Sequence, residues 1–459
     1  MSIRRFPTAS PSLKRRAPGP RGLAAFAALL RFKRQGVVFL EQAVRDYGDV
    51  VSLHCLGFKV HIISRPDLIH HILTDPHDNY VKAQGNRRTQ RFFGHAMQTS
   101  NGDFARRQRR LMAAAFHRDH VRVYAQRVVL ATLNMCQSWV VGEQRNVSQE
   151  IMDLALNLGI QMLFGTAPGE ASARIAQSFT TVIRLMDSFL KPPAWLPTPR
   201  NRRYIKAMAQ LDADVTRLIQ TRRRQPQDSN DVLSCLIAAT DRDGHGMSDQ
   251  QIRDELVSML AAGYHTVAVA LIQTFRLLAE HDEADARLAA ELHQVLGDRP
   301  PTADDLDHLL FTVQVIKETL RLCPPAGVIA RRVVAEDDLG GWRIPARSMV
   351  FISQWIMHHR SQFYDAPEVF RPERWSPEFE RALPTFAYFP FGWGPRGCIA
   401  QALAMMELQL IVATVAQRFR MELPQRSPST QMWDTIRDEG GLTVRLHDRL
   451  GVPEMQTGH

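Results

Sequence analysis

The sequence predicts a mainly α-helical protein with small β-sheets, built as a single large domain around one long helix. Of its 459 residues 45% are apolar, which suffices for a sizeable core. Helical periodicity dominates from about residue 146 onward, and no repeat, low-complexity tract or long linker divides the chain. The apolar helix that follows Ser248 is long enough, at about 1.5 Å per residue, to cross a large domain.

The first elements follow a basic, proline-rich entry. We expect residues 1–20 to form a flexible basic segment, 21–450 the domain, and 451–459 a tail. The stretch "VVSLHCLGFKVHIIS" at 50–64 predicts a β-hairpin that turns at Leu56-Gly57. From about 146 to 224 the pattern is helical, with a predicted loop, "KPPAWLPTPRNRR", at 191–203.

The central helix has the clearest start signal. Ser248 as N-cap and Gln251 three residues later form a capping box. A further helix is expected from about Ala303 to Cys323, where two prolines stop it, and another follows Cys398. Short strands are predicted at 348–353 and 442–446.

Composition excludes several classes of protein. The five cysteines are odd in number, scattered and free of any C-x-x-C pair, so neither a disulfide framework nor a zinc site is indicated. The net charge of +10 favours an acidic partner, and no nucleic-acid recognition motif accompanies it. The run "LAAFAALL" falls far short of the roughly 20 residues that span a bilayer. We expect a cytoplasmic monomer with no membrane span.

The segment "FPFGWGPRGC", 389–398, carries the chemistry. Its glycines satisfy G-x-G-x-x-G, the pattern of a dinucleotide-binding loop. Pro390 and Pro395 oppose that interpretation, and fewer than 70 residues follow in which to build a parallel sheet. The alternative is a loop that presents Cys398 as a thiolate for iron, with loop and helix N–H groups stabilising the anion and Arg396 pairing with a negative cofactor group. Taken alone, such a cysteine is more often a buried bystander than a ligand.

Four motifs together resemble one family. Phe391, Gly394, Arg396 and Cys398 match the F-x-x-G-x-R-x-C signature of the cytochrome P450 haem-thiolate monooxygenases. Three further signatures occur in that family's order: E-x-x-R as Glu318 and Arg321, P-E-R as Pro372, Glu373 and Arg374, and A-G-x-x-T as Ala262, Gly263 and Thr266. The resemblance runs from about Pro18 to Leu446.

The resemblance implies a cytochrome P450-type domain whose long central helix lies over haem b (iron protoporphyrin IX), with Cys398 as the iron ligand. The other cofactor-binding residues it implies are Arg396, Arg109, Arg332, Phe391, Gly392 and Ala262. Arg331 is the alternative to Arg332, because the match can slip by one residue. The implied catalytic residues are Thr266, His265 and Gly263. Glu318 and Arg321 share a helix face, and the resemblance adds Arg374 to a buried network that braces the cysteine loop.

Several positions depart from the family pattern or have a second explanation. Gly263 is explained either by a local helix distortion over the haem or by packing. Ala105 replaces a usual Trp or His, and Ala400 replaces a usual glycine. His265 stands where an acid is common: it relays protons, points away while Thr266 and water suffice, or signals other chemistry.

The implied activity is insertion of one oxygen atom from O₂ into a hydrophobic small molecule, by hydroxylation or epoxidation. Electrons would come from a separate ferredoxin or flavodoxin-type donor with its reductase. The alternatives are a peroxygenase or redox-neutral haem-thiolate enzyme, or a non-catalytic haem sensor. A terpenoid, fatty acid or polyketide is the expected substrate. The expected pocket walls are 83–98, 175–205, Ala262, Thr266, 326–329 and 441–442.

Overall fold

The computed structural model describes residues 15–55, 57–74, 78–83, 87–116, 118–187, 196–226, 230–424 and 441–449. Several expectations fall partly outside these residues: most of the N-terminal segment, the C-terminal tail, Leu56 of the predicted turn, and parts of the pocket walls at 84–86 and 188–195. The chain forms two compact units that alternate along the sequence. The first combines the residues up to Ala83 with Ala326–Glu368 and Ala382–Gly397, and the second holds the rest.

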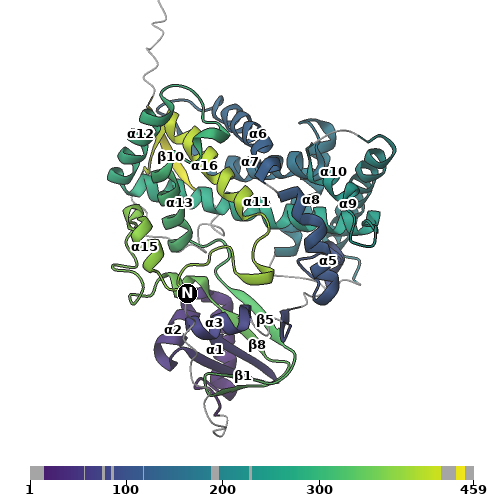
Figure 1. Ribbon diagram of the computed structural model, residues 1–459, viewed down its shortest axis with the longest axis vertical. Coiled ribbons are helices and arrows are strands. Elements are labelled where there is room, and N and C mark those ends of the chain that lie inside the picture. Colours follow the sequence, from purple (N-terminus) through teal and green to yellow (C-terminus); the bar gives the residue numbers. More distant parts are fainter. Residues whose placement is uncertain are drawn as a thin grey trace, which may run out of the picture. The chain divides into compact units, whose positions relative to one another are not determined.

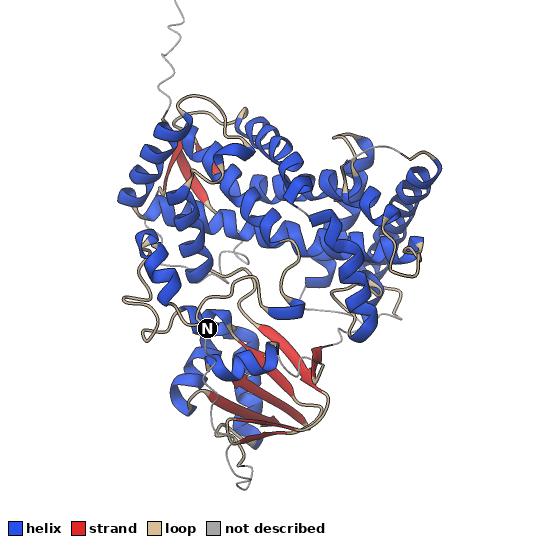
Figure 2. Cartoon of the chain, in the orientation of Figure 1, coloured by secondary structure: helices blue, strands red, loops and turns tan. Residues whose placement is uncertain are grey.

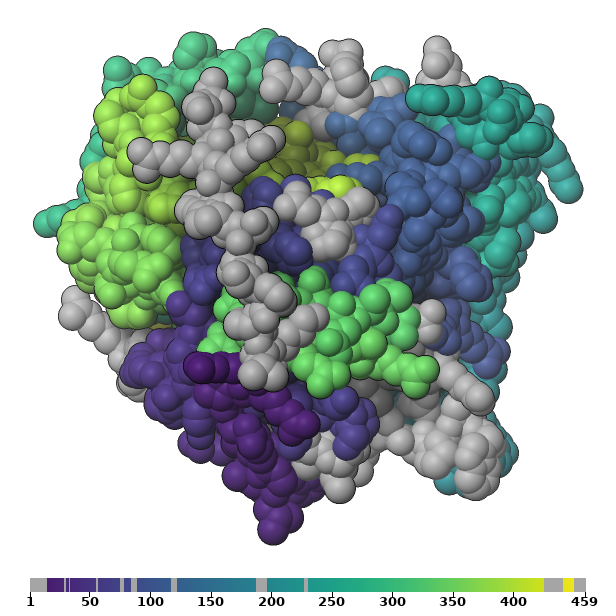
Figure 3. Space-filling model, turned by 60° about the horizontal axis from the view of Figure 1, so that its bottom comes forward, coloured from purple at the N-terminus to yellow at the C-terminus, as the bar shows by residue number. Residues whose placement is uncertain are grey.

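The first unit is organised around a five-stranded sheet of order β1-β2-β8-β5-β3 (Figure 2). Only β2 and β8 run parallel, and the other pairs are antiparallel. Its strands are β1 (Val50–Cys55), β2 (Phe58–Ile63), β3 (Tyr80–Lys82), β5 (Ile329–Val333) and β8 (Met349–Ile352), with a two-stranded ribbon of β6 (Asp337–Leu339) and β7 (Trp342–Ile344). Its helices are α1 (Gly22–Gln35), α2 (Val37–Tyr47), α3 (Pro66–Leu73) and α14 (Gln354–His358). N-terminal residues and the 326–368 segment therefore lie side by side, as the purple and green surfaces of Figure 3 show.

The second unit is almost entirely helical (Figure 1). Its α-helices are α4 (Arg87–Phe93), α5 (Gly102–Ala113), α6 (Arg118–Cys136), α7 (Val147–Phe164), α8 (Glu170–Asp187), α9 (Pro199–Arg224), α10 (Val232–Ala238), α11 (Asp249–Glu280), α12 (Asp282–Leu296), α13 (Leu310–Leu322), α15 (Pro377–Ala382) and α16 (Gln401–Arg418). Short 3-10 turns occur at Ala114–Phe116, Ala303–Asp305 and Pro372–Arg374. A three-stranded sheet of order β4-β10-β9 joins β4 (Gln144–Asn146), β10 (Thr443–Asp448) and β9 (Phe419–Glu422).

The predicted central helix is confirmed as α11, which begins at the capping box of Ser248 and Gln251 and runs for 32 residues. It is the only helix within the described ranges that is long and apolar enough to cross a membrane. Its apolar window is 67% buried inside the protein, so α11 is a core helix. The structure also confirms the predicted hairpin as β1 and β2, the two predicted strands as β8 and β10, and the helix after Cys398 as α16.

Two predicted boundaries are wrong. The loop predicted to reach residue 203 ends earlier, because Pro199 occupies the first helical position of α9 and Thr198 caps it, accepting a hydrogen bond from the Asn201 N–H at 3.1 Å. The helix predicted from Ala303 begins only at Leu310. The Asp305 carboxylate accepts hydrogen bonds from Arg299 and from the Thr302 backbone, which closes a separate turn there.

Candidate active site

The loop that carries Cys398 is shaped by glycines in the left-handed region. Gly392 and Gly394 both have φ of 69°. Gly394 also approaches α3 so closely that a Cβ would lie 2.6 Å from the Leu73 carbonyl oxygen. The 3-10 helix η4 (Gly394–Arg396) follows, and the chain then reaches Cys398. These two glycines are therefore explained by the backbone of the cysteine loop and its contact with α3.

Cys398 lies three residues before α16, and its side chain reaches solvent. Its sulfur accepts a hydrogen bond from the backbone N–H of Ala400, which favours the thiolate as expected. Desolvation by the surrounding protein is the larger effect, and it raises the thiol pKa despite that bond and the positive charge of Arg109. The protein alone therefore favours the thiol. A bound metal cation is what would complete the stabilisation of the anion, since a ligating thiol loses its proton.

A bare patch interrupts the otherwise buried surface of α11. Ala262 and Gly263 are exposed, whereas the helix is buried for several turns on either side. A Cβ built at Gly263 meets no atom within 4 Å outside its own helix, so packing within the described protein does not explain this glycine. The helix assignment runs unbroken from Asp249 to Glu280 through this position. The patch is small and apolar, and it fits a flat apolar group lying against the helix.

Thr266 and His265 border this patch. The Thr266 hydroxyl donates towards the carbonyl oxygens of Ala262 at 2.8 Å and Gly263 at 3.2 Å. The hydroxyl hydrogen is thereby used within the helix, and the hydroxyl oxygen is left able to accept a hydrogen bond from a neighbouring group. His265 is half-buried, and its ring meets Tyr264 edge-on, with centroids 5.9 Å apart.

Two arginines of the first unit influence one another. Arg396 donates to the backbone carbonyl of Tyr80, and Arg331 donates to that of Ala330 at 3.0 Å. Burial first, and then the positive charge of Arg396, lower the pKa of Arg331 to about 10. A guanidinium is normally charged well above that value. The surroundings of Arg331 therefore oppose its charge, and an anionic group bound beside this pair would reverse that effect.

Arg331 and Arg332, the two candidate cofactor-binding arginines on β5, differ in their surroundings. Arg331 is half-buried near Arg396, whereas Arg332 is exposed. Successive residues of a strand point to opposite faces, so only one of the two can face the other arginine. Arg331 is therefore the arginine of β5 whose charge interacts with that of Arg396. The remaining implied residues of this unit, Phe391 and Gly392, are half-buried in the cysteine loop.

The implied site residues are divided between the two units. The second unit contains Arg109 on α5, with Ala262, Gly263, His265 and Thr266 on α11, and Cys398 before α16. The first contains Arg331, Arg332, Phe391, Gly392 and Arg396.

The predicted bracing network is present in the second unit. Glu318 and Arg321 on α13 are fully buried and joined by two bonds, of 2.8 and 2.9 Å. Arg374 donates to the same carboxylate at 2.9 Å. Sequence reasoning missed two more donors to it: the Trp375 indole N–H at 2.9 Å and the Arg371 backbone N–H at 3.0 Å. The Trp that directly follows the P-E-R motif was the available signal.

Sequence reasoning also missed how the loop at 92–98 is held. The N-terminal part of α11 contacts it in three places: Asp254 accepts from the His95 N–H at 2.8 Å, Glu255 from the Met97 N–H at 2.6 Å, and Arg253 donates to the Phe92 carbonyl at 2.8 Å. All three side chains of α11 are buried. Three consecutive charged residues on a long, largely apolar helix were the sign that a polar group packs there. An expected pocket wall is therefore anchored to α11.

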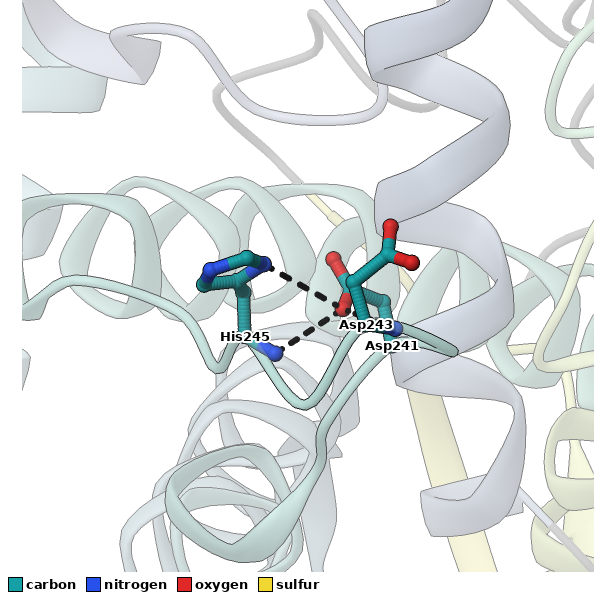
Figure 4. A group of neighbouring side chains, drawn as sticks. All are labelled: Asp241, Asp243 and His245. Carbon is teal, nitrogen blue, oxygen red and sulfur yellow. Dashed lines mark hydrogen bonds and ion pairs between the residues drawn. The ribbon is translucent and has the colours of Figure 1, made fainter.

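One group of potential metal ligands occurs in the described parts of the chain, at Asp241, Asp243 and His245 (Figure 4). The Asp241 carboxylate is already engaged: Arg107 donates to one oxygen at 2.6 Å, and the N–H groups of Asp243 and His245 donate to the other. The Arg107 hydrogen bond is the main reason that the pKa of Asp241 lies below its usual range. The group is explained as a turn anchored to α5.

Comparisons with known proteins converge on one family. A family model described as Cytochrome P450 matches residues 17–443. The chain is 33% identical over 381 residues to the cyclooctat-9-en-7-ol 5-monooxygenase of Streptomyces melanosporofaciens, covering 82% of this chain and 83% of that one. It is 32% identical over 381 residues to the pentalenene oxygenase of Streptomyces avermitilis, covering 82% and 84%. The solved structure of a cyanobacterial cytochrome P450 with bound retinoic acid superposes with a TM-score of 0.83 at 23% identity, covering 95% of this chain and 100% of that one.

Proposed function

This chain belongs to the cytochrome P450 family, and we propose that it oxidises a polycyclic terpenoid. As a P450 it is a haem b-dependent monooxygenase that acts on hydrophobic small molecules and takes electrons from a redox partner. The terpenoid assignment is supported by the names of two relatives that each match about four-fifths of the chain. Among the substrate classes expected from sequence, the terpenoid is the one that these relatives favour.

The observation that carries the reaction type is the bare apolar patch of α11 beside a single hydroxyl. Haem, once bound to thiolate, supplies oxygen activation. Ala262 and Gly263 would leave room for a flat cofactor and a small molecule beside the helix. Thr266 would accept a hydrogen bond from a water there and so hold that water, as a proton donor, beside the helix.

The remaining roles follow from the placement of charge. Cys398 would lose its proton and ligate the iron. Arg331 and Arg396 would bind a haem carboxylate, which explains why their surroundings oppose the charge of Arg331. Arg109, whose charge already acts on the Cys398 thiol, would be a further cation at the cofactor. Phe391 and Gly392 would contact the haem through the cysteine loop.

We also propose the finer identity of the partner and the location. The net charge of +10 suits an acidic ferredoxin or flavodoxin-type donor with its reductase. A cytoplasmic enzyme is consistent with the bacterial relatives.

The substrate class is tested by titrating the ferric protein with ligands that displace the haem's water, read in the absorbance spectrum. Polycyclic terpene hydrocarbons and alcohols should give saturable shifts at lower concentrations than fatty acids of equal carbon number. Cys398→Ser should lose the thiolate-type spectrum of the reduced, carbon monoxide-bound protein, while Cys235→Ser, a half-buried control, keeps it. Tighter fatty-acid binding would overturn the terpenoid proposal, and an unchanged Cys398→Ser spectrum would overturn the ligand assignment.

The role of Thr266 is tested by the coupling of NADH to product in a surrogate ferredoxin system. Thr266→Ala should keep consuming NADH while most of it yields hydrogen peroxide, because the hydroxyl that holds the proton-donating water is gone. Thr274→Ala is the matched control, since Thr274 makes the same bond to the Ala270 carbonyl at 2.8 Å two turns away. His265→Ala should have a modest effect. Full coupling in Thr266→Ala would favour the peroxygenase or redox-neutral alternative.

A further inference from the structure

The N-terminal helix α1 exposes three large apolar side chains on one side and buries two alanines on another. Leu23 is 89% exposed, and Phe26 and Leu30 are each 46% exposed. Ala25 and Ala28 are buried against the first unit. Leu23, Phe26 and Leu30 are spaced by three and four residues, so they form one stripe along the helix. In Figure 3 this darkest purple segment is open on the surface in view. A stripe of this kind marks a contact surface.

The stripe continues onto the tip of the first hairpin. Phe58, at the start of β2, is 69% exposed. The backbone of Arg21, the N-cap of α1, pairs with His54 on β1, and His54 pairs with Lys59 on β2. Adjacent strands lie about 4.8 Å apart, so the start of α1 and the hairpin tip are near neighbours. Both belong to the first unit. We call Leu23, Phe26, Leu30 and Phe58 the apolar edge.

The N-terminal segment that carries most of the apolar edge has charge of one sign. The sequence has nine basic residues and no acid before Glu41. Exposed cations on the described part of this segment and on the hairpin are Arg15, Arg16, Arg21, Arg31, Arg34 and Lys59. A second copy docking on the same face would bring like charges together. Large apolar side chains bordered by cations are what an anionic lipid surface accommodates, with the apolar groups among the acyl chains and the cations at the headgroups.

We propose that α1 and the tip of the β1–β2 hairpin rest on the surface of an anionic lipid bilayer. The 14 residues of α1 extend only about 21 Å, which is too short to cross the hydrocarbon core of about 30 Å. The helix therefore lies along the interface. This attachment does not depend on the substrate class proposed above.

The proposal is tested by sedimenting the holoenzyme with vesicles of phosphatidylcholine alone or with phosphatidylglycerol added. Wild type should partition onto the anionic vesicles and only weakly onto the neutral ones. The double variant Leu23→Ser/Phe26→Ser should bind anionic vesicles at least tenfold more weakly. Arg31→Gln and Arg34→Gln should each weaken binding about fivefold at low salt. Leu310→Ser, which alters an apolar residue 67% exposed in the second unit, is the matched control and should bind like wild type.

Each variant should keep full haem content and an unchanged thermal midpoint, since the altered side chains are exposed. The proposal is overturned if wild type ignores anionic vesicles at low salt. It is also overturned if the double variant binds anionic vesicles as well as wild type does. The binding would then come from non-specific attraction between the basic protein and the anionic lipid. A dimer that dissociates in Leu23→Ser, or a protein donor whose binding alone is lost in the double variant, would assign the apolar edge to a protein interface instead.

Discussion

Two charged clusters, one in each unit, differ in how the protein surrounds their charges. In the second unit the Glu318 carboxylate accepts hydrogen bonds from Arg321, Arg374, Trp375 and the Arg371 backbone, so each charge has partners within the fold. In the first unit Arg331 lies near another arginine, and its surroundings lower its pKa. The Glu318 network is closed within the protein, whereas the surroundings of Arg331 oppose its charge. The difference predicts that Glu318 matters most for the stability of the fold and Arg331 for the binding of an anionic group.

The largest effect is expected at Glu318. Glu318→Ala would leave two buried guanidinium groups without their carboxylate, which costs about 3–5 kcal/mol in the free energy of unfolding. Denaturant unfolding and haem content measure this, and we expect loss of both stability and haem loading.

The matched control lies in the same motif as Arg374. Glu373 pairs with Arg287 at 3.0 Å, but both side chains are largely exposed. Glu373→Gln should therefore change stability by less than about 1 kcal/mol. Similar losses in both variants would contradict the claim that burial gives Glu318 its importance.

At Arg331 we expect a smaller effect, which weakens haem binding without lowering the stability of the apoprotein. Arg331→Gln should weaken haem binding by about tenfold or more, the value of a hydrogen bond to a charged group. The apoprotein should be no less stable than wild type, because the substitution removes one of two like charges. Haem transfer to an excess of acceptor protein and thermal unfolding of the apoprotein measure the two properties.

Arg332→Gln is the neighbouring control on β5. It should change haem affinity by less than about twofold, since no charge-assisted bond would be lost. If Arg332→Gln weakens haem binding more than Arg331→Gln does, the cofactor arginine is Arg332 and the lowered pKa of Arg331 has another explanation.

Features set by residues close together in the chain could be predicted from the sequence. Features set by strand register or by contacts between distant residues could not. The spacing of three between Glu318 and Arg321, the capping box of α11 and the cysteine loop were all legible, because each is a local pattern. The choice between Arg331 and Arg332 was not, because one residue of slip along a strand reverses the face. The anchoring of His95 and Met97 by α11 joins residues about 160 apart in the chain, so no local pattern signalled it. The start of α9 was missed because Pro199 was taken as part of a loop when it was an N1 residue.

The smallest expected effect is on the pH dependence of stability, and it concerns the buried His61 imidazole of the first unit. His61 lies on β2 between Ser52 and Val350, is 1% exposed, and has no hydrogen-bond partner for either ring nitrogen among the described residues. Burial, and then the charges of His54 and Lys59, lower its pKa from 6.5 to about 4.

The unfolded state therefore binds more protons than the folded state between these two pKa values, and His61 destabilises the fold as pH falls from about 6.5 towards 4. At pH 5.5 the loss relative to neutral pH is about 1 kcal/mol. His61→Leu should remove that part of the pH dependence, while the exposed control His308→Gln should retain it. Denaturant unfolding at pH 7.5 and 5.5 measures the difference. Equal pH dependence in wild type and His61→Leu would mean that the buried imidazole finds a proton partner, and that the first unit compensates its buried charge more fully than the Arg331 pair suggests.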